Sequence, residues 1–241
     1  MKKVSEPTIG RLSVYLRLLG ELDAEGVATV SSDELAARAG TTAAQVRKDL
    51  SLFGTFGKRG LGYVVKDLVA RLRSILGLER TWRVAVVGAG RIGAALVGYE
   101  AFRERGFYIE AVFDTDASKV GQRWGELVVQ ADGEMERVLR ERDIEIAVVA
   151  VPVPAAQSVV ARVVAAGVRG ILNFAPTQLD VPEGVALTTV DLAMELEGLS
   201  YALSRQAAGG GNERRTRSGG ANPAGGSRIS GAGRGAVGRR D

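Results

Sequence analysis

The first 25 residues carry hydrophobic side chains at the spacing of an amphipathic helix. Apolar residues recur every three or four positions: Ile9, Leu12, Leu16, Leu19 and Leu22. This spacing places them on one face, because an α-helix completes a turn about every 3.6 residues. We therefore predict a helix over residues 8–25 that ends near Gly26.

Two short helices are predicted next, and each begins with a capping box. In Ser31-x-x-Glu34 and Thr42-x-x-Gln45, a hydroxyl and a longer polar side chain stand three residues apart. Such a pair can satisfy the free backbone N–H groups at a helix start. The first helix is predicted over Asp33–Ala39 and ends at Gly40. Two helices joined by a tight turn with a glycine are typical of a helix-turn-helix.

The second of these helices has one apolar and one polar face. Val46, Leu50 and Phe53 share one side of the helix, and we expect them to be buried. The polar residues that remain are expected to face outward: Gln45, Arg47, Lys48 and Ser51.

Residues 54–65 are predicted to form a β-hairpin with Lys58 and Arg59 near its tip. Its glycines permit the positive φ angles that tight turns require. A helix-turn-helix followed by a hairpin is a winged helix. The leucine spacing over residues 66–79 predicts a helix that connects it to the rest of the chain.

From residue 83 onward, short apolar strands alternate with helices. The strands are expected at residues 84–88, 108–114, 144–152 and 170–174 and near Val185. Helical patterns lie near residues 92–105, 133–142 and 154–166. Apolar strands that alternate with helices predict a parallel sheet covered on both faces, hence an α/β protein with a Rossmann-type domain.

A last helix is predicted from Asp191 to about Arg205, with Leu192, Leu196, Leu199 and Leu203 on one stripe. Residues 206–241 are mostly Gly, Arg, Ser and Ala, and we expect them to be disordered. The predicted organisation is therefore a winged helix over 1–80, a Rossmann domain over 81–190, a helix over 191–205 and a tail over 206–241.

Composition excludes several kinds of chemistry. The 241-residue chain has no cysteine and no histidine, so disulfides, thiolate metal sites and histidine general bases are excluded, and we predict no metal site. No stretch approaches a membrane span, and the first residues carry no apolar signal-peptide core, so we expect a cytoplasmic protein.

Charge is unevenly distributed along the chain. Lys and Arg exceed Asp and Glu by four over residues 1–80, fall five short of them over 81–205, and exceed them by five over 206–241. A basic N-terminal block on an acidic body suits a polyanionic partner that meets one end of the protein.

A glycine loop, Gly88-x-Gly90-x-x-Gly93, stands between the first predicted strand and the helix after it. Such a loop binds a dinucleotide pyrophosphate at the start of a helix, so residues 88–93 (Gly88, Ala89, Gly90, Arg91, Ile92 and Gly93) are candidate cofactor contacts. Asp114 ends the next strand and is placed to accept hydrogen bonds from ribose hydroxyls. Its charge favours NAD(H) over NADP(H).

The sequence offers no catalytic partner for this loop. No Tyr-x-x-x-Lys motif or histidine follows to exchange a proton with a substrate. We interpret the dinucleotide as a bound signal and the protein as not an enzyme. Three alternatives remain: an NAD-dependent dehydrogenase with an accessory domain, a regulator that senses another nucleotide such as coenzyme A, and a DNA-binding protein whose Rossmann half only dimerises.

Candidate DNA contacts lie on the second short helix, where Ser51 is one of them, and on the hairpin. Arg47 and Lys48 can reach guanine edges or phosphates. Gln45 can pair with adenine or bind phosphate, or it can simply cap the helix. Arg59 suits the narrow minor groove of A·T-rich DNA, with Lys58 beside it. We therefore expect double-stranded DNA as a partner.

These motifs resemble the Rex family of redox-sensing transcriptional repressors. The matching stretches include Tyr15-Leu-Arg17, Gln45-Val-Arg-Lys-Asp-Leu-Ser51, Phe56-Gly-x-Arg59-Gly-x-Gly-Tyr63, the glycine loop, Gly170-Ile-Leu-Asn-Phe-Ala-Pro176 and Asp191-Leu-Ala-x-Glu195-Leu. The resemblance covers about residues 5–205, and the tail has no counterpart in it.

The resemblance implies a homodimer that binds a pseudo-palindromic operator and loses DNA affinity when NADH binds. It also implies that the last helix is exchanged between protomers near the nicotinamide. By motif, Arg17, Tyr99 and Asp191 match the polar group that couples the nucleotide pocket to the DNA-binding domain. Tyr99 is also a candidate cofactor contact, and Asp191 also suits a helix N-cap. Position 192 is Leu, so an aromatic contact to nicotinamide supplied there in relatives would be missing.

Overall fold

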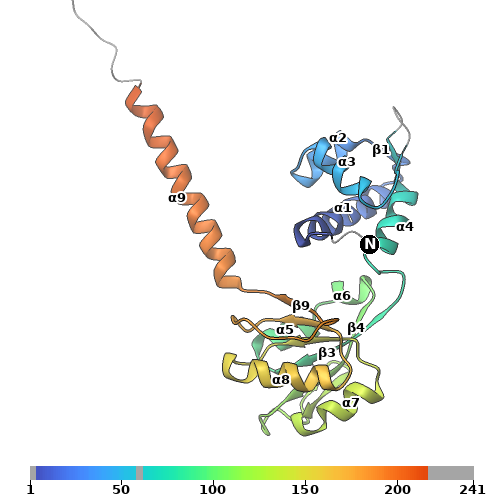
Figure 1. Cartoon of the computed structure of the whole chain (residues 1–241), viewed down its shortest axis with the longest axis vertical. Helices are drawn as coiled ribbons and strands as arrows, with labels where there is room; N and C mark the ends of the chain where they lie inside the picture. Colours follow the sequence, from blue (N-terminus) through green and yellow to red (C-terminus); the bar gives the residue numbers. More distant parts are fainter. Residues whose placement is uncertain (1–3, 58–61, 217–241) are drawn as a thin grey trace, which may run out of the picture. The chain divides into compact units, whose positions relative to one another are not determined.

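The computed structural model describes residues 4–57 and 62–216 of the chain. The chain divides into two units, one up to Val190 and the other from Asp191 onward. Figure 1 labels the helices and some of the strands. The predicted hairpin tip with Lys58 and Arg59, and the part of the predicted tail beyond Thr216, lie outside the described residues.

Four helices and a two-stranded sheet form the N-terminal part. The elements are α1 (Glu6–Ala24), β1 (Thr29–Val30), α2 (Ser32–Ala39), α3 (Ala43–Ser51), β2 (Tyr63–Val64) and α4 (Val65–Ile75). Leucines from α1, α2, α3 and α4 pack into one core together with Tyr15, Val30 and Val46. The apolar faces predicted for α1 and α3 are therefore mostly buried, although Ile9 is exposed and Leu16 and Phe53 are half-buried.

Both short helices begin as the capping motifs predict, although only half of each capping box forms. Ser31 Oγ accepts a hydrogen bond from Glu34 N–H at 3.1 Å, and Thr42 Oγ1 accepts one from Gln45 N–H at 3.2 Å. Gly40 ends α2 in the left-handed region, at φ 64°. The Gln45 side chain does not complete its box, because it bonds Asp49 instead.

The described part of the wing pairs with a segment outside the predicted hairpin. Tyr63–Val64 pairs antiparallel with Thr29–Val30, so the sheet joins the wing to the segment before α2. A Cβ at Gly62 would lie 2.5 Å from the carbonyl oxygen of Val30, and only glycine permits this close approach. The predicted hairpin over residues 54–65 stays a prediction, because its tip lies outside the described residues; the described strand Tyr63–Val64 pairs with a segment more than 30 residues earlier.

The central domain is a seven-stranded sheet in the order β5-β6-β4-β3-β7-β8-β9. Its strands are β3 (Trp82–Val87), β4 (Phe107–Asp114), β5 (Arg123–Trp124), β6 (Leu127–Ala131), β7 (Ile146–Val149), β8 (Gly170–Asn173) and β9 (Ala186–Thr189). All neighbours are parallel except β5, which pairs antiparallel with β6. Without β5 this is the doubly wound Rossmann order, and the order reverses between β3 and β7.

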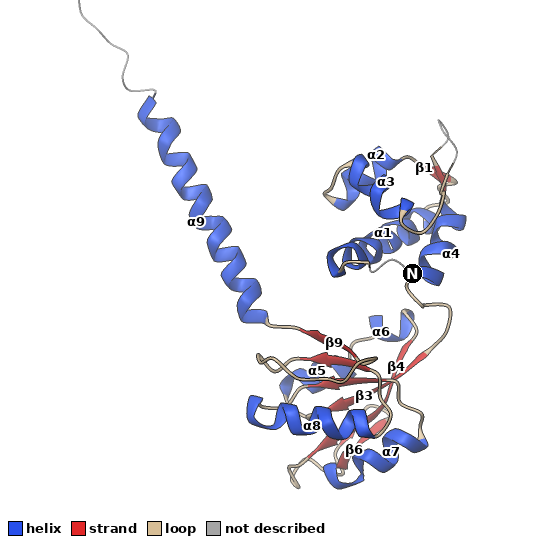
Figure 2. Ribbon diagram, in the orientation of Figure 1, coloured by secondary structure: helices blue, strands red, loops and turns tan. Residues whose placement is uncertain are grey.

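Helices cover both faces of this sheet, as the alternating pattern predicts (Figure 2). One core joins β3, β4 and β7 to α7 (Met135–Glu141) and α8 (Val153–Ala165). The other face packs against α5 (Arg91–Val97). The predicted helix over residues 92–105 is two helices, α5 and α6 (Ala101–Glu104), because α5 ends at Gly98.

Three elements were not predicted between Asp114 and Met135. The edge strand β5 has two residues, its neighbour β6 has five, and the 3-10 turn Asp132–Glu134 precedes α7. The sequence signal for these strands was the apolar run Leu127-Val128-Val129 after Gly125. This run is too short to show the pattern that identifies a strand.

The C-terminal unit is the helix α9 (Leu192–Thr216). It extends beyond Arg205, so the prediction of a disordered tail from residue 206 is wrong up to Thr216. Gln206, Ala207 and Ala208 favour a helix, and the glycines that follow lower its stability without removing a hydrogen bond. The first proline after α9 begins is Pro223, outside the described residues.

None of the described helices has the length and apolar character needed to cross a membrane.

Candidate nucleotide pocket and DNA-reading helix

The glycine loop connects β3 to α5, and packing dictates two of its glycines. Gly88 has φ 106°, and a Cβ there would lie 2.4 Å from the carbonyl oxygen of Ala150 at the end of β7. A Cβ at Gly93 would lie 2.2 Å from the carbonyl oxygen of Gly88. Both positions therefore exclude any side chain, as expected for the tight turn and the close helix-sheet contact of a dinucleotide-binding loop.

Gly90 differs from the other two glycines because its surroundings are open. Its backbone, at φ −90° and ψ −167°, suits any residue, and no described atom comes within 4 Å of a Cβ built there. The space beside Gly90 is thus free for a bound group, and the exposed Arg91 and Ile92 begin α5 next to it. Ala89, between the glycines, is buried.

A cavity of about 520 Å³ lies at the carboxyl ends of the central strands. Its walls come from the ends of β3, β4 and β7, from the loop after β4 and from α8, and include Gly88, Gly90, Asp114, Lys119, Asp132, Val151 and Ala155. This is the edge where the strand order reverses, which is the place where doubly wound sheets bind ligands. Its residues therefore fit a dinucleotide whose phosphates meet the glycine loop.

Asp114 lines this cavity, but its carboxylate is already partly bonded. It accepts hydrogen bonds from Ala89 N–H at 2.7 Å and Asp116 N–H at 2.8 Å, and it pairs with Lys119 Nζ at 3.0 Å. Since a carboxylate accepts about four hydrogen bonds, it keeps capacity for a ribose hydroxyl. The sequence analysis did not identify Lys119 as part of the pocket. The charged cluster Asp114-x-Asp116-x-x-Lys119 was the pattern that could have indicated it.

The same contacts keep Asp114 ionised. Burial would raise the pKa of this carboxyl, but the hydrogen bonds from Asp116, Lys119 and Ala89 outweigh burial and lower the pKa below its usual value. The cavity therefore carries the negative charge of Asp114 at neutral pH, with Lys119 beside it. Because Asp116 and Asp132 also line the cavity, carboxylates outnumber the one lysine in its lining.

Replacing Asp114 with alanine is expected to lower NADH affinity about tenfold and to leave operator binding without NADH unchanged. The substitution removes one charge-assisted acceptor for ribose and the partner of Ala89 N–H, which together are worth roughly 1–3 kcal/mol. Fluorescence titration of NADH gives the affinity, and a gel shift gives operator binding. Glu110→Ala on the same strand, outside the cavity lining, is the control. Equal losses in both variants would contradict the assignment.

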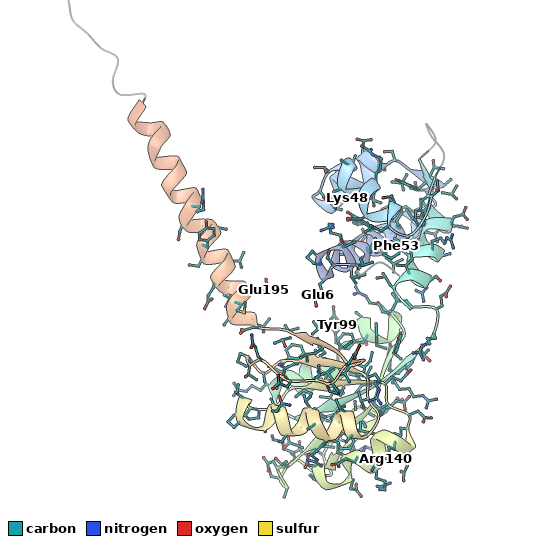
Figure 3. All side chains as sticks on the ribbon, in the orientation of Figure 1. Glu6, Lys48, Phe53, Tyr99, Arg140 and Glu195 are labelled. Carbon is teal, nitrogen blue, oxygen red and sulfur yellow. The ribbon has the colours of Figure 1, made fainter. Side chains whose placement is uncertain are left out.

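Three of the four polar residues predicted to face outward from α3 are exposed. Arg47, Lys48 and Ser51 are solvent-accessible, and Figure 3 labels Lys48 on this helix. Arg47 Nη1 donates to Ser32 Oγ at 2.7 Å, and Ser51 Oγ donates to the carbonyl oxygen of Lys48 at 2.8 Å. The middle and last turn of α3 thus present two cations, Arg47 and Lys48, that are free of carboxylate partners among the described residues.

Gln45 is the exception, because it is half-buried and its side chain turns back onto its own helix. Its Nε2 donates to Asp49 Oδ1 at 2.8 Å. Asp49 is almost fully buried, and it also receives hydrogen bonds from Arg11 and Tyr15 of α1. The sequence analysis missed these three residues. The pattern that could have indicated them is Asp49 itself, a carboxylate three positions after Val46 on the helix face expected to be apolar.

Burial within this cluster perturbs two titratable groups. For Asp49, burial acts to raise the pKa, but hydrogen bonds from Arg11, Gln45 and Tyr15 lower the pKa below its usual value. Burial, and next the hydrogen bond to Asp49, raise the pKa of Tyr15 to about 12. Asp49 is therefore a carboxylate and Tyr15 a neutral donor at any physiological pH.

The three predicted coupling residues lie on separate elements. Arg17 is exposed on α1. Tyr99, labelled in Figure 3, is 55% exposed after α5 and makes an edge-to-face contact with Phe102. Asp191 is the N-cap of α9, since its Oδ1 accepts hydrogen bonds from Ala193 and Met194 N–H.

The described residues contain no cluster of three or more Asp and Glu side chains that could hold a metal ion.

A helix-turn-helix with exposed cations and a Rossmann domain with a glycine loop define the class of a nucleotide-responsive DNA-binding protein. Two family models agree with this division. One, described as "Putative DNA-binding protein N-terminus", matches residues 3–51, and one described as "CoA binding domain" matches residues 79–177.

Similar proteins identify the family. A redox-sensing transcriptional repressor Rex from Carboxydothermus hydrogenoformans is 52% identical over 203 residues, which cover 84% of this chain and 98% of that protein. The Rex repressor of Streptomyces coelicolor is 46% identical, over 85% of this chain and 79% of that protein. The chain belongs to the Rex family of redox-sensing transcriptional repressors. These relatives are named as repressors and not as enzymes.

Solved structures of a Rex-family repressor, RSP, have the same fold. RSP in complex with β-NADH superposes with a TM-score of 0.78, at 35% identity, over 86% of this chain and 98% of that one. RSP in complex with β-NAD⁺ and operator DNA superposes with a TM-score of 0.81, at 35% identity, over 90% of this chain and all of that one. The fold class predicted from the sequence and the resemblance to Rex are thereby confirmed.

Proposed function

We propose that this chain is a homodimeric transcriptional repressor that binds operator DNA and is released from it when NADH binds. One observation carries the proposal: the same chain holds two exposed cations, Arg47 and Lys48, on a helix-turn-helix and an open glycine position, Gly90, at the switch point of a Rossmann sheet. DNA readout and dinucleotide binding thus belong to one molecule. We infer that it acts in the cytoplasm, where its operator would be found.

Within the proposed site, residues 88–93 hold the pyrophosphate and Asp114 accepts the ribose hydroxyls. The open backbone at Gly90 supports this, as does the ionised carboxylate of Asp114 in the cavity wall. Carboxylates on the cavity lining disfavour a 2′-phosphate, so we expect NADH to bind more tightly than NADPH. The dinucleotide is a signal here, and no proton transfer or hydride transfer is assigned to the chain.

The charge of the nicotinamide ring gives a physical basis for redox sensing. The oxidised ring is positively charged and the reduced ring is neutral, and burial at an apolar interface between protomers penalises an unpaired charge. A ligand shifts a two-state equilibrium only by its differential affinity for the two states. We therefore expect NADH to favour the dimer that cannot bind the operator, while NAD⁺ distinguishes the two states less.

The exposed stripe of α9 supports dimerisation. Leu192, Leu196, Leu199 and Leu203 are each more than 60% exposed in the single chain. Leucines in a row along one helix indicate a surface that a partner covers, and the partner proposed is the α9 region of a second copy. We also propose that Arg17, Tyr99 and Asp191 couple the pocket to the DNA-binding domain across this dimer.

Leu196→Asp combined with Leu203→Asp is expected to convert the dimer into a monomer and to lower operator affinity at least 100-fold. Two buried carboxylates at an apolar interface cost several kcal/mol, and a monomer contacts only one operator half-site. Light scattering measures the mass, and a gel shift measures binding. Glu197→Asp on the same helix is the control, and a double variant that stays dimeric would contradict the role given to the stripe.

The proposed function is tested by a gel-shift titration on an A·T-rich inverted repeat. Wild-type protein is expected to bind the repeat alone and with NAD⁺, and to be released as NADH rises. NADPH and coenzyme A are added in parallel, because the family model that matches residues 79–177 is described by coenzyme A. Release by coenzyme A and not by NADH would favour the second candidate, a repressor that senses that nucleotide. Consumption of NADH with a substrate would favour a dehydrogenase.

A further inference from the structure

We propose that Asp49 fixes the orientation of the DNA-reading helix α3 on α1, and that Tyr15 and Gln45 are positioning residues that act on operator recognition through it. The inference rests on the proposed function and deepens it, since it concerns how the operator is read. It also reassigns Gln45, which the sequence offered as a DNA contact.

The Asp49 carboxylate is saturated by neighbours from two helices. Arg11 Nε donates to its Oδ2 at 2.6 Å, and Arg11 Nη2 donates to its Oδ1 at 2.7 Å. Tyr15 Oη donates to Oδ2 at 3.0 Å, and Gln45 Nε2 donates to Oδ1 at 2.8 Å. Each oxygen thus accepts two hydrogen bonds, which is about the capacity of a carboxylate. Asp49 itself is 1% exposed.

A purely apolar contact would suffice to hold α1 and α3 together. The surrounding core is built largely from leucines, and a buried ion pair is on balance a weak source of stability. What the ion pair adds is direction, because the planar guanidinium of Arg11 meets the two oxygens of Asp49 side by side. Apolar packing is non-directional and allows small rotations that this geometry resists.

Direction matters for α3 because the reading residues precede Asp49 immediately in the chain. Arg47 and Lys48 project from the same rigid helix, so a rotation of α3 about its axis changes where both cations point. One residue corresponds to about 100° of rotation around a helix, and a fraction of that angle would misalign a contact to a base edge. The Asp49 contacts with α1 therefore set the angle at which Arg47 and Lys48 meet DNA.

The commitment of Gln45 to Asp49 also limits what Gln45 can read. Recognition of adenine by glutamine uses the amide oxygen and the amide nitrogen together. In this structure the nitrogen donates to a buried carboxylate that also needs that hydrogen bond. We infer that Gln45 helps to hold the reading helix in place through its hydrogen bond to Asp49 and contributes no base preference of its own.

The first test is Tyr15→Phe, which removes one hydrogen bond to Asp49 and keeps the ring. Tyr15 is fully buried in the core and cannot contact DNA, yet operator affinity is expected to fall about tenfold with NADH affinity unchanged. The matched control is Leu22→Val, in the same helix and the same core but without polar contacts. It lowers stability and is expected to leave operator affinity unchanged, with both variants assayed far below their melting temperatures.

The second test uses Gln45→Ala on the operator and on a set of operators with single base substitutions. The inference expects a similar fall in affinity, roughly three- to tenfold, on every DNA of the set, so that the base preferences stay as in wild type. A residue that reads a base would instead lose the preference at one position. That result would overturn the reassignment of Gln45.

Wild-type protein in the same gels separates this inference from the proposed function. If wild type does not bind the operator, or NADH does not release it, the proposed function is wrong and the inference falls with it. If wild type behaves as proposed but Tyr15→Phe binds equally well, or Leu22→Val loses as much affinity, only the positioning role of Asp49 is overturned.

Discussion

Gly90→Glu is expected to abolish the response to NADH while operator binding persists. Because Gly90 has an ordinary backbone conformation and open surroundings, the fold accepts the side chain. The new carboxylate would occupy the space proposed for the pyrophosphate. Two unit charges about 4 Å apart repel by roughly 4 kcal/mol at an effective dielectric constant near 20, so NADH affinity is expected to fall at least about 100-fold. Fluorescence titration and a gel shift with NADH measure the two effects.

Two glycine variants serve as controls for this result. Gly133→Glu adds the same charge at another glycine with open surroundings, and it is expected to keep NADH release. Gly88→Ala places a Cβ 2.4 Å from a carbonyl oxygen at φ 106°, so it is expected to lower the melting temperature and damage the whole domain. If Gly90→Glu were released by NADH as wild type is, residues 88–93 would not be the pyrophosphate site.

The double variant Arg47→Ala and Lys48→Ala is expected to lower operator affinity by about 100-fold or more and to leave NADH affinity unchanged. Each contact to a base edge or phosphate contributes roughly 1–3 kcal/mol, and both side chains are exposed, so their removal does not disturb the core. A gel shift over a range of salt concentrations measures the effect. The salt dependence is expected to become shallower, because fewer counterions are released on binding.

The control for this variant comes from the cations of α4. Arg71→Ala and Arg73→Ala remove the same charge from the same domain at positions outside the reading helix. They are expected to reduce operator affinity far less. Equal losses in the two double variants would mean that the net charge of the domain, rather than α3, governs DNA binding.

Local patterns were sufficient to predict most of the fold. The hydrophobic spacing of α1 and α3, the capping residues Ser31 and Thr42, and the alternation of strands with helices each depend on residues close together in the chain. The glycine loop could also be predicted from the sequence, because a tight turn before a helix constrains the residue types at six consecutive positions. For these features the physical cause is local, so the sequence alone determined them.

Contacts between distant segments were not predicted. The partner of β2 is a segment more than 30 residues earlier, and Arg11 and Tyr15 meet Asp49 across a similar separation. Periodicity identifies which face of a helix is buried, but it does not say which residues of other segments pack against that face. It therefore gave Gln45 as a candidate for DNA binding without indicating that its side chain bonds Asp49.

In this protein the sequence by itself determined the kind of elements, the glycine loop and the exposed cations Arg47 and Lys48. Only the tertiary structure decided that Gly90 is open while Gly88 and Gly93 are closed, that Lys119 pairs with Asp114, and that Asp49 joins α3 to α1. The physical reason is that burial and hydrogen bonding depend on which side chains converge in space, and a linear pattern does not contain that information.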